Sequence, residues 1–189
     1  MPTSVGHALA GAATAWAADL LPGRRQIPAV RLKPDTTNYD LTLICAALAA
    51  LPDADLLFHV HRTVTHSIGA VILVTILAAA VTGKVTRGDR AKILRISLTC
   101  GAAYATHLLL DWLAMDRYAP YGIQALWPFS SGWYISNLDW FPQVARRRFF
   151  TWPVIRYNAW VVVQECVRLV PILVGIGLLR ARARRAAHV

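Results

Sequence analysis

The sequence predicts an all-α, polytopic helical membrane protein with about four or five membrane segments. Hydrophobic residues make up 56% of the 189 residues and charged residues only 16%, whereas soluble domains carry about 25% charged residues. Residues 63–83 contain no Asp, Glu, Lys or Arg, and about 20 apolar residues are enough for a helix to cross a bilayer. We therefore expect a single membrane-embedded helical domain over residues 1–189.

Four weaker apolar stretches supply the remaining expected segments, at residues 1–18, 41–51, 96–110 and 157–179. The stretch at 41–51 is too short to cross a bilayer by itself. The first stretch lacks the basic residues that open a secretory signal, so we expect it to be retained as a helix. Its small residues, among them Gly6 and Gly11, permit close helix packing. In the last stretch Glu165 and Arg168 are spaced i,i+3 and are placed to pair on one helix face.

The stretch at 115–156 is rich in aromatic residues, Gly and Pro and shows neither helical nor strand periodicity. We expect an ordered loop at the membrane interface, where Trp and Tyr side chains concentrate. Three cysteines, Cys45, Cys100 and Cys166, lie far apart in apolar runs and are predicted to be buried small hydrophobic residues.

Basic residues follow the first, third and last apolar stretches. The groups are Arg24, Arg25, Arg31 and Lys33; Lys84, Arg87, Arg90, Lys92 and Arg95; and Arg180, Arg182, Arg184 and Arg185. If the chain crosses at each segment, all three groups lie on one side, which the positive-inside rule assigns to the cytoplasm. The basic tail at 180–189 would then be cytoplasmic. The net charge of +10 does not indicate nucleic-acid binding, because no basic face on a soluble fold is evident.

The same alternation gathers five of the six histidines on the opposite side of the membrane, all except His188. They are His7, His59, His61, His66 and His107, accompanied by Asp53, Asp55 and Asp111. Charge distribution and histidine position are independent signals, and both predict the same topology, with a site that faces outward.

The pair His107 and Asp111 is spaced i,i+4, so both side chains share one helix face. Such a pair in isolation is usually only a polar contact, but ionisable groups inside a membrane segment are costly and usually face an ion, a cavity or a partner. We expect a metal site whose ligands are His7, Asp53, His66, His107 and Asp111. A His/Asp donor set without a CxxC motif favours Zn²⁺, one or two ions, with Mn²⁺ as the alternative.

Metal-assisted hydrolysis is the chemistry that this donor set favours. Bound Zn²⁺ lowers the pKa of its water to about 7. Asp55 is our candidate for the group that accepts a proton, and His61 or Arg62 for the group that stabilises developing negative charge. Arg62 is equally well explained as an interfacial residue that extends its charge to the headgroups. The roles of His59 and Asp139 are left open.

A site at the headgroup level favours a membrane lipid or lipid-linked substrate with a phosphoester or another ester. Two alternatives remain: a metal or ion transporter, and a non-catalytic membrane protein in which a metal ion joins helix ends. The substrate and the oligomeric state are not predicted.

The segments "GHALAG", "LPDADLLF", "HRTVTHS", "HLLLDWL" and "YGIQALWPFS" together resemble the YdjM-like family of predicted membrane-bound metal-dependent hydrolases. The resemblance covers roughly the first 130 residues, and the HRxxTHS element with a downstream HxxxD is its most specific part. It implies an inner-membrane protein in which His and Asp residues assemble a metal site.

A fainter similarity is to the zinc-dependent phospholipase C and P1 nuclease superfamily. The ligand order of that superfamily, His, Asp, His and then HxxxD, matches His7, Asp53, His66, His107 and Asp111. The similarity implies that Asp111 bridges two zinc ions. No further histidine follows before His188, so ligands for a third zinc ion are not expected.

Overall fold

The computed structural model describes residues 1–21, 41–58, 62–86 and 88–186, and within them all regular secondary structure is helical apart from two isolated β-bridges. The all-α prediction is therefore confirmed. The α-helices are α1 (Ser4–Ala18), α2 (Leu41–Ala50), α3 (Ile68–Val85), α4 (Arg90–Leu113) and α5 (Trp152–Ala186), and the 3₁₀ helices are η1 (Leu51–Phe58) and η2 (Val64–His66).

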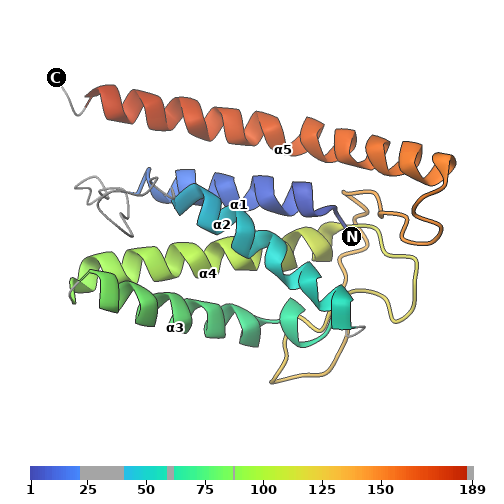
Figure 1. The fold of residues 1–189 in the computed structure, drawn as a ribbon, viewed down its shortest axis with the longest axis horizontal. Helices are drawn as coiled ribbons and strands as arrows, with labels where there is room; N and C mark the ends of the chain where they lie inside the picture. The colour runs from blue at the N-terminus through green and yellow to red at the C-terminus, as the bar shows by residue number, and fades with distance from the viewer. Residues whose placement is uncertain (22–40, 59–61, 87, 187–189) are drawn as a thin grey trace.

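The helices lie side by side in an elongated bundle, with α5 along one edge and α3 along the other (Figure 1). α1 contacts α2, α4 and α5, while α4 contacts α1, α2 and α3. α1 and α4 are thus the central helices. The N-terminus, the η1 and η2 turns and the long loop before α5 all lie at the same end of the bundle.

Three helices of the described residues are long and apolar enough to cross a membrane: Ile68–Val85, Arg90–Leu113 and Trp152–Ala183. α1 has 15 residues, which at 1.5 Å per residue is about 22 Å, and α2 has 10 residues. Both are shorter than the roughly 20 residues that span a hydrocarbon core. The expected four or five membrane segments are therefore not confirmed.

The helix formed by the apolar stretch at 63–83 begins only at Ile68, later than the composition indicates. Ser67 is the N-cap of α3, and its hydroxyl accepts a hydrogen bond from the Ala70 N–H at 3.3 Å. A serine at this position satisfies one of the free N–H groups of the first turn. His66 consequently lies in η2, directly before the membrane helix, and not on its face.

Small residues bring α1 and α2 into close contact, as expected from the sequence. A Cβ atom on Gly11 would collide with the Cys45 carbonyl oxygen and would lie 2.7 Å from the Ala49 Cβ. Ala15, Cys45 and Ala103 form one buried cluster between α1, α2 and α4. Cys45 and Cys100 are buried, in agreement with their prediction, and Cys166 is half-buried.

Glu165 fixes α5 to the start of α1. Its carboxylate is fully buried and accepts hydrogen bonds from the Thr3 N–H at 2.7 Å and the Thr3 hydroxyl at 2.5 Å. Arg168 donates instead to the Gln164 carbonyl at 2.7 Å. The tertiary contact with an otherwise unsatisfied helix start thus replaces the local i,i+3 pair expected from the sequence.

The end of the bundle farthest from the loop is basic. Lys84, Arg90, Lys92, Arg95 and Arg180 lie where α3 and α5 end and α4 begins. Asp19 joins three helices there, with an ion pair to Arg180 at 2.6 Å and another to Arg95 at 3.5 Å. The expected basic group at Arg24–Lys33 lies outside the described residues.

Candidate metal centre

Four separate segments place histidine and aspartate side chains at the end of the bundle opposite the basic end. His7 lies in the first turns of α1, Asp53 in η1 and His66 in η2, while His107 and Asp111 lie in the last two turns of α4. His7, His66, His107 and Asp111 are at most 1% exposed. The five expected ligands are therefore brought together from segments up to 104 residues apart.

Three donor atoms form a nearly regular triangle. The Nε2 atoms of His66 and His107 are 3.0 Å apart, and the Asp111 Oδ2 lies 3.4 Å from the first and 3.3 Å from the second. Tetrahedral Zn²⁺ with ligands at about 2.0–2.1 Å requires ligand atoms about 3.3 Å apart. The triangle therefore matches one face of a tetrahedral zinc site.

Hydrogen bonds at the far sides of both rings determine which nitrogens face each other. The His107 Nδ1 lies 2.8 Å from the Ala49 carbonyl oxygen, and the His66 Nδ1 lies 3.2 Å from the Asp55 carboxylate. Both partners only accept hydrogen bonds, so each Nδ1 carries a proton, and each Nε2 faces inward. A proton shared between the two Nε2 atoms or a cation bound by both would satisfy this contact at 3.0 Å.

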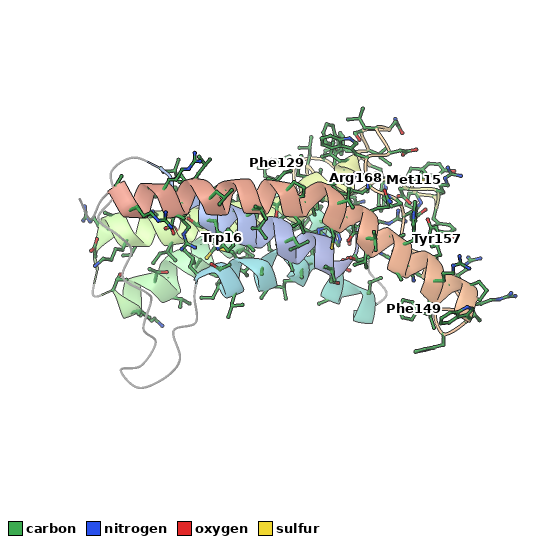
Figure 2. The ribbon with its side chains drawn as sticks, turned by 90° about the horizontal axis from the view of Figure 1, so that it is seen from above. Trp16, Met115, Phe129, Phe149, Tyr157 and Arg168 are labelled. Carbon is green, nitrogen blue, oxygen red and sulfur yellow. The ribbon has the colours of Figure 1, made fainter. Side chains whose placement is uncertain are left out.

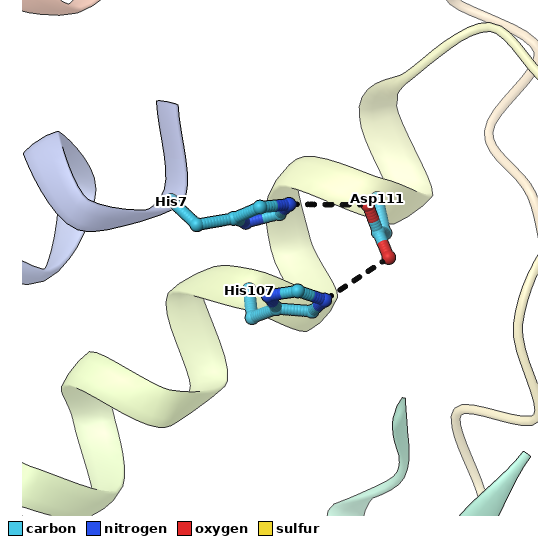
Figure 3. Close-up of side chains that lie close together, drawn as sticks. All are labelled: His7, His107 and Asp111. Carbon is cyan, nitrogen blue, oxygen red and sulfur yellow. Dashed lines mark ion pairs between the residues drawn. The ribbon is translucent and has the colours of Figure 1, made fainter. Parts of the chain in front are cut away.

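A second arrangement of donors shares the same residues. The His7 Nε2 lies 3.5 Å from Oδ1 of Asp111, on the side opposite the Oδ2 that faces His107 (Figure 3). The His7 ring stacks on the His107 ring with centroids 3.7 Å apart. The Asp53 Oδ1 lies 3.9 Å from the His107 Nε2. The structure thus contains two possible metal-binding groups, His7–His107–Asp111 and Asp53–His66–His107. The Asp111 Oδ1 faces His7, and its Oδ2 faces His66 and His107.

Several of these buried polar atoms have no hydrogen-bond partner. In the described part of the chain they are Nδ1 and Nε2 of His7, Oδ1 of Asp53, and both carboxylate oxygens of Asp111. A buried polar atom without a partner costs about 1–3 kcal/mol, and more when it is charged. A divalent cation would satisfy these atoms together, so the donor set and its spacing fit Zn²⁺.

Asp55 lies behind His66. In addition to its contact with the His66 ring, its carboxylate accepts the Thr65 hydroxyl at 2.5 Å, and the Tyr104 hydroxyl donates to the Thr65 carbonyl at 2.7 Å. A carboxylate that holds the outer nitrogen of a ligand histidine is the usual supporting arrangement at metal sites.

The other expected functional residues do not join this cluster. His59 and His61 lie outside the described residues. Arg62 forms an ion pair with Asp116, and Asp139 is exposed in the loop. The sequence did not predict the roles of Asp116 and Thr65 or the contact of Glu165 with Thr3. For Asp116 the one signal was its position five residues after Asp111.

A comparison with protein families identifies the family of the chain. A family model described as the YdjM inner membrane protein matches residues 1–188. The chain belongs to the YdjM inner membrane protein family. The match extends the resemblance from roughly the first 130 residues to almost the whole chain. No curated protein and no solved structure matches the chain, and the fainter similarity to the phospholipase C and P1 nuclease superfamily is not shown.

Proposed function

We propose that this YdjM family protein is a metal-dependent hydrolase that acts at the membrane surface on a phosphoester or another ester of a lipid or lipid-linked substrate. The observation that carries the proposal is the pair of inward-facing Nε2 atoms of His66 and His107, 3.0 Å apart, beside the Asp111 carboxylate, whose oxygens have no hydrogen-bond partner. His7 and Asp53 complete the donor set, which accommodates one or two ions.

A metal ion held by these residues would supply the electrophile. Bound Zn²⁺ would polarise an ester or phosphoryl oxygen and lower the pKa of a bound water to about 7. The residues of the chain provide orientation. The Ala49 carbonyl holds the proton on the His107 Nδ1 and Asp55 holds the proton on the His66 Nδ1, so both rings keep their Nε2 atoms available as ligands.

The predicted catalytic roles of Asp55, His61 and Arg62 stay predictions. The contacts of Asp55 with His66 and Thr65 favour a positioning role over that of a proton acceptor. Arg62 borders a pocket, where its guanidinium would stabilise negative charge on a substrate.

Exposed aromatic side chains support a site at the lipid interface. Phe129, Trp140, Phe150 and Trp152 are 80%, 62%, 92% and 73% exposed, and the aromatic loop projects from the same end of the bundle as the cluster (Figures 1 and 2). Such side chains concentrate at the level of lipid headgroups. The basic far end favours a multi-pass topology in the inner membrane in which that end and the C-terminus are cytoplasmic and the site faces outward.

A structural metal site is the second candidate, because His7, His66 and His107 are 0% exposed and Asp111 only 1%. A closed, fully protein-liganded site is typical of structural zinc, whereas catalytic zinc keeps one position open. A transporter is less well supported, since its ligands are expected near the middle of the membrane and these lie at one end of the bundle.

Product analysis with purified protein tests the proposal. Zinc-loaded protein in mixed micelles is incubated with phosphatidic acid, phosphatidylglycerol and phosphatidylcholine, and the products are identified by mass spectrometry. We expect turnover that disappears in Asp111→Asn and persists in Asp89→Asn, which alters the same helix at its other end. Zinc-loaded wild type without turnover on any of the three lipids would favour the structural metal site.

A further inference from the structure

One pocket is lined by residues that lie close in sequence to the expected metal ligands. It has a volume of about 260 Å³, and its lining includes Leu56, Arg62, Asp116, Tyr118 and Arg146. Each of the first three continues a segment that carries expected metal ligands: Leu56 belongs to η1, Arg62 lies two residues before η2, and Asp116 follows the end of α4. We refer to this pocket as the arginine pocket.

The charged side chains of the arginine pocket are two guanidinium groups, from Arg62 and Arg146, and one carboxylate, from Asp116; Met1, whose amino group donates to the Met115 carbonyl at 3.0 Å, also lines it. The Asp116 side chain is 1% exposed. Its oxygens accept from the Arg62 guanidinium, the Tyr118 N–H at 3.2 Å, the Gly122 N–H at 2.8 Å and the Gln143 Nε2 at 3.1 Å. The carboxylate is thus fully engaged by the protein, whereas Arg146 has no carboxylate partner among the described residues.

Arg62 is held in an uncommon backbone conformation. Its φ is +70°, in the left-handed region that residues other than glycine rarely adopt. The Gln124 N–H donates to the Arg62 carbonyl at 3.0 Å, and Asp116 binds the guanidinium at the other end of the residue. Residues fixed in this way are frequent at ligand-binding sites. Here the constraint directs a guanidinium group to the pocket wall.

We propose that the arginine pocket binds the phosphate group of an anionic ligand, with Arg146 and Arg62 as its receptors. Guanidinium groups match phosphate oxygens in geometry and charge. The inference rests on the proposed function in one respect, in that it takes this ligand to be the substrate of the metal centre. It deepens that proposal by assigning the substrate class: phosphate-bearing molecules and not neutral esters.

The size of the pocket fits a headgroup and excludes a whole lipid. Its volume lies just below the range of about 300–1,000 Å³ that holds drug-sized ligands. Leu56 and Tyr118, which line it, are also 41% and 53% exposed at the surface. A phosphate can therefore enter from the interface while acyl chains remain in the bilayer.

Binding measurements with a matched arginine control test the inference. The zinc-loaded protein is titrated in neutral detergent micelles with phosphatidic acid, with diacylglycerol and with soluble glycerol 3-phosphate, and Trp fluorescence is recorded, since Trp133 lies next to Arg62 with 5.9 Å between guanidinium carbon and ring centre. The variants are Arg146→Gln, Arg146→Lys and Arg148→Gln. Arg148 belongs to the same exposed basic run but does not line the pocket.

We expect Arg146→Gln to weaken phosphatidic acid binding about tenfold or more, as for loss of a charged hydrogen-bond partner, with partial rescue in Arg146→Lys and no change in Arg148→Gln. Diacylglycerol should bind weakly and equally to all variants. An effect on phosphatidic acid alone identifies a lipid headgroup, and a parallel effect on glycerol 3-phosphate identifies any phosphate ester.

Equal losses in Arg146→Gln and Arg148→Gln, or no loss in either, would overturn the arginine pocket. The zinc content of each preparation is measured in parallel. A variant that loses phosphate binding but keeps zinc therefore separates the failure of this inference from the failure of the proposed metal centre.

Discussion

Replacing His107 and Asp111 together with alanine is expected to abolish zinc binding, from one or two equivalents in the wild type to none. Both residues contribute donor atoms to the His66–His107–Asp111 triangle, and no other described group takes their place. Elemental analysis of protein purified in detergent measures the change. Asp89→Asn is the matched control, because it alters an aspartate on the same helix, and asparagine is an equally good N-cap.

Zinc should also stabilise the wild type and not the double variant. A ligand that binds only the folded state at one hundred times its Kd adds about 2.7 kcal/mol of stability. The melting temperature of the wild type should therefore rise with zinc and fall with a chelator, while that of the double variant should respond to neither. Equal zinc content in wild type and double variant would rule out the proposed ligands.

Replacing Asp55 with alanine should weaken zinc binding roughly 10- to 100-fold, the usual effect of removing the residue that supports a ligand histidine. Asp55 contacts the His66 Nδ1 at 3.2 Å and the Thr65 hydroxyl at 2.5 Å. Without it, the His66 ring is free to rotate or to change tautomer. Competition titrations with a zinc chelator of known affinity measure the loss.

Asp55→Asn separates orientation from charge. The asparagine carbonyl still accepts from the His66 Nδ1, so this variant should recover most of the affinity if Asp55 acts by orientation. If Asp55→Ala binds zinc as tightly as the wild type, the residue has no supporting role, and its predicted role as a proton acceptor becomes the better explanation.

The helices and the ligand cluster could both be predicted from the sequence, because both depend on the pattern of apolar runs. The apolar runs identify the helices, and helices that alternate in direction return every second connection to the same end of a bundle. His7, Asp53, His66 and Asp111 all lie at such connections or helix ends. The i,i+4 spacing of His107 and Asp111 places their side chains 3.3 Å apart, as expected for one face of a helix.

Contacts between residues far apart in the chain could not be predicted from the sequence. The ion pair of Arg62 with Asp116 spans 54 residues, and the contact of Glu165 with Thr3 spans 162. No local pattern predicts either, and for Glu165 the i,i+3 rule favoured the wrong partner. The expected four or five membrane segments are not confirmed, because the first two helices have only 15 and 10 residues in the described part of the chain, which hydropathy alone does not show.

X-ray absorption at the zinc edge of the purified wild-type protein tests the metal centre most directly. We expect nitrogen and oxygen ligands at about 2.0–2.1 Å, with the outer-shell scattering of at least two imidazole rings, and loss of that signal in the His107→Ala/Asp111→Ala variant. A sulfur shell at about 2.3 Å, or a spectrum without imidazole scattering, would contradict the account, because the metal would then bind to the cysteines or to solvent.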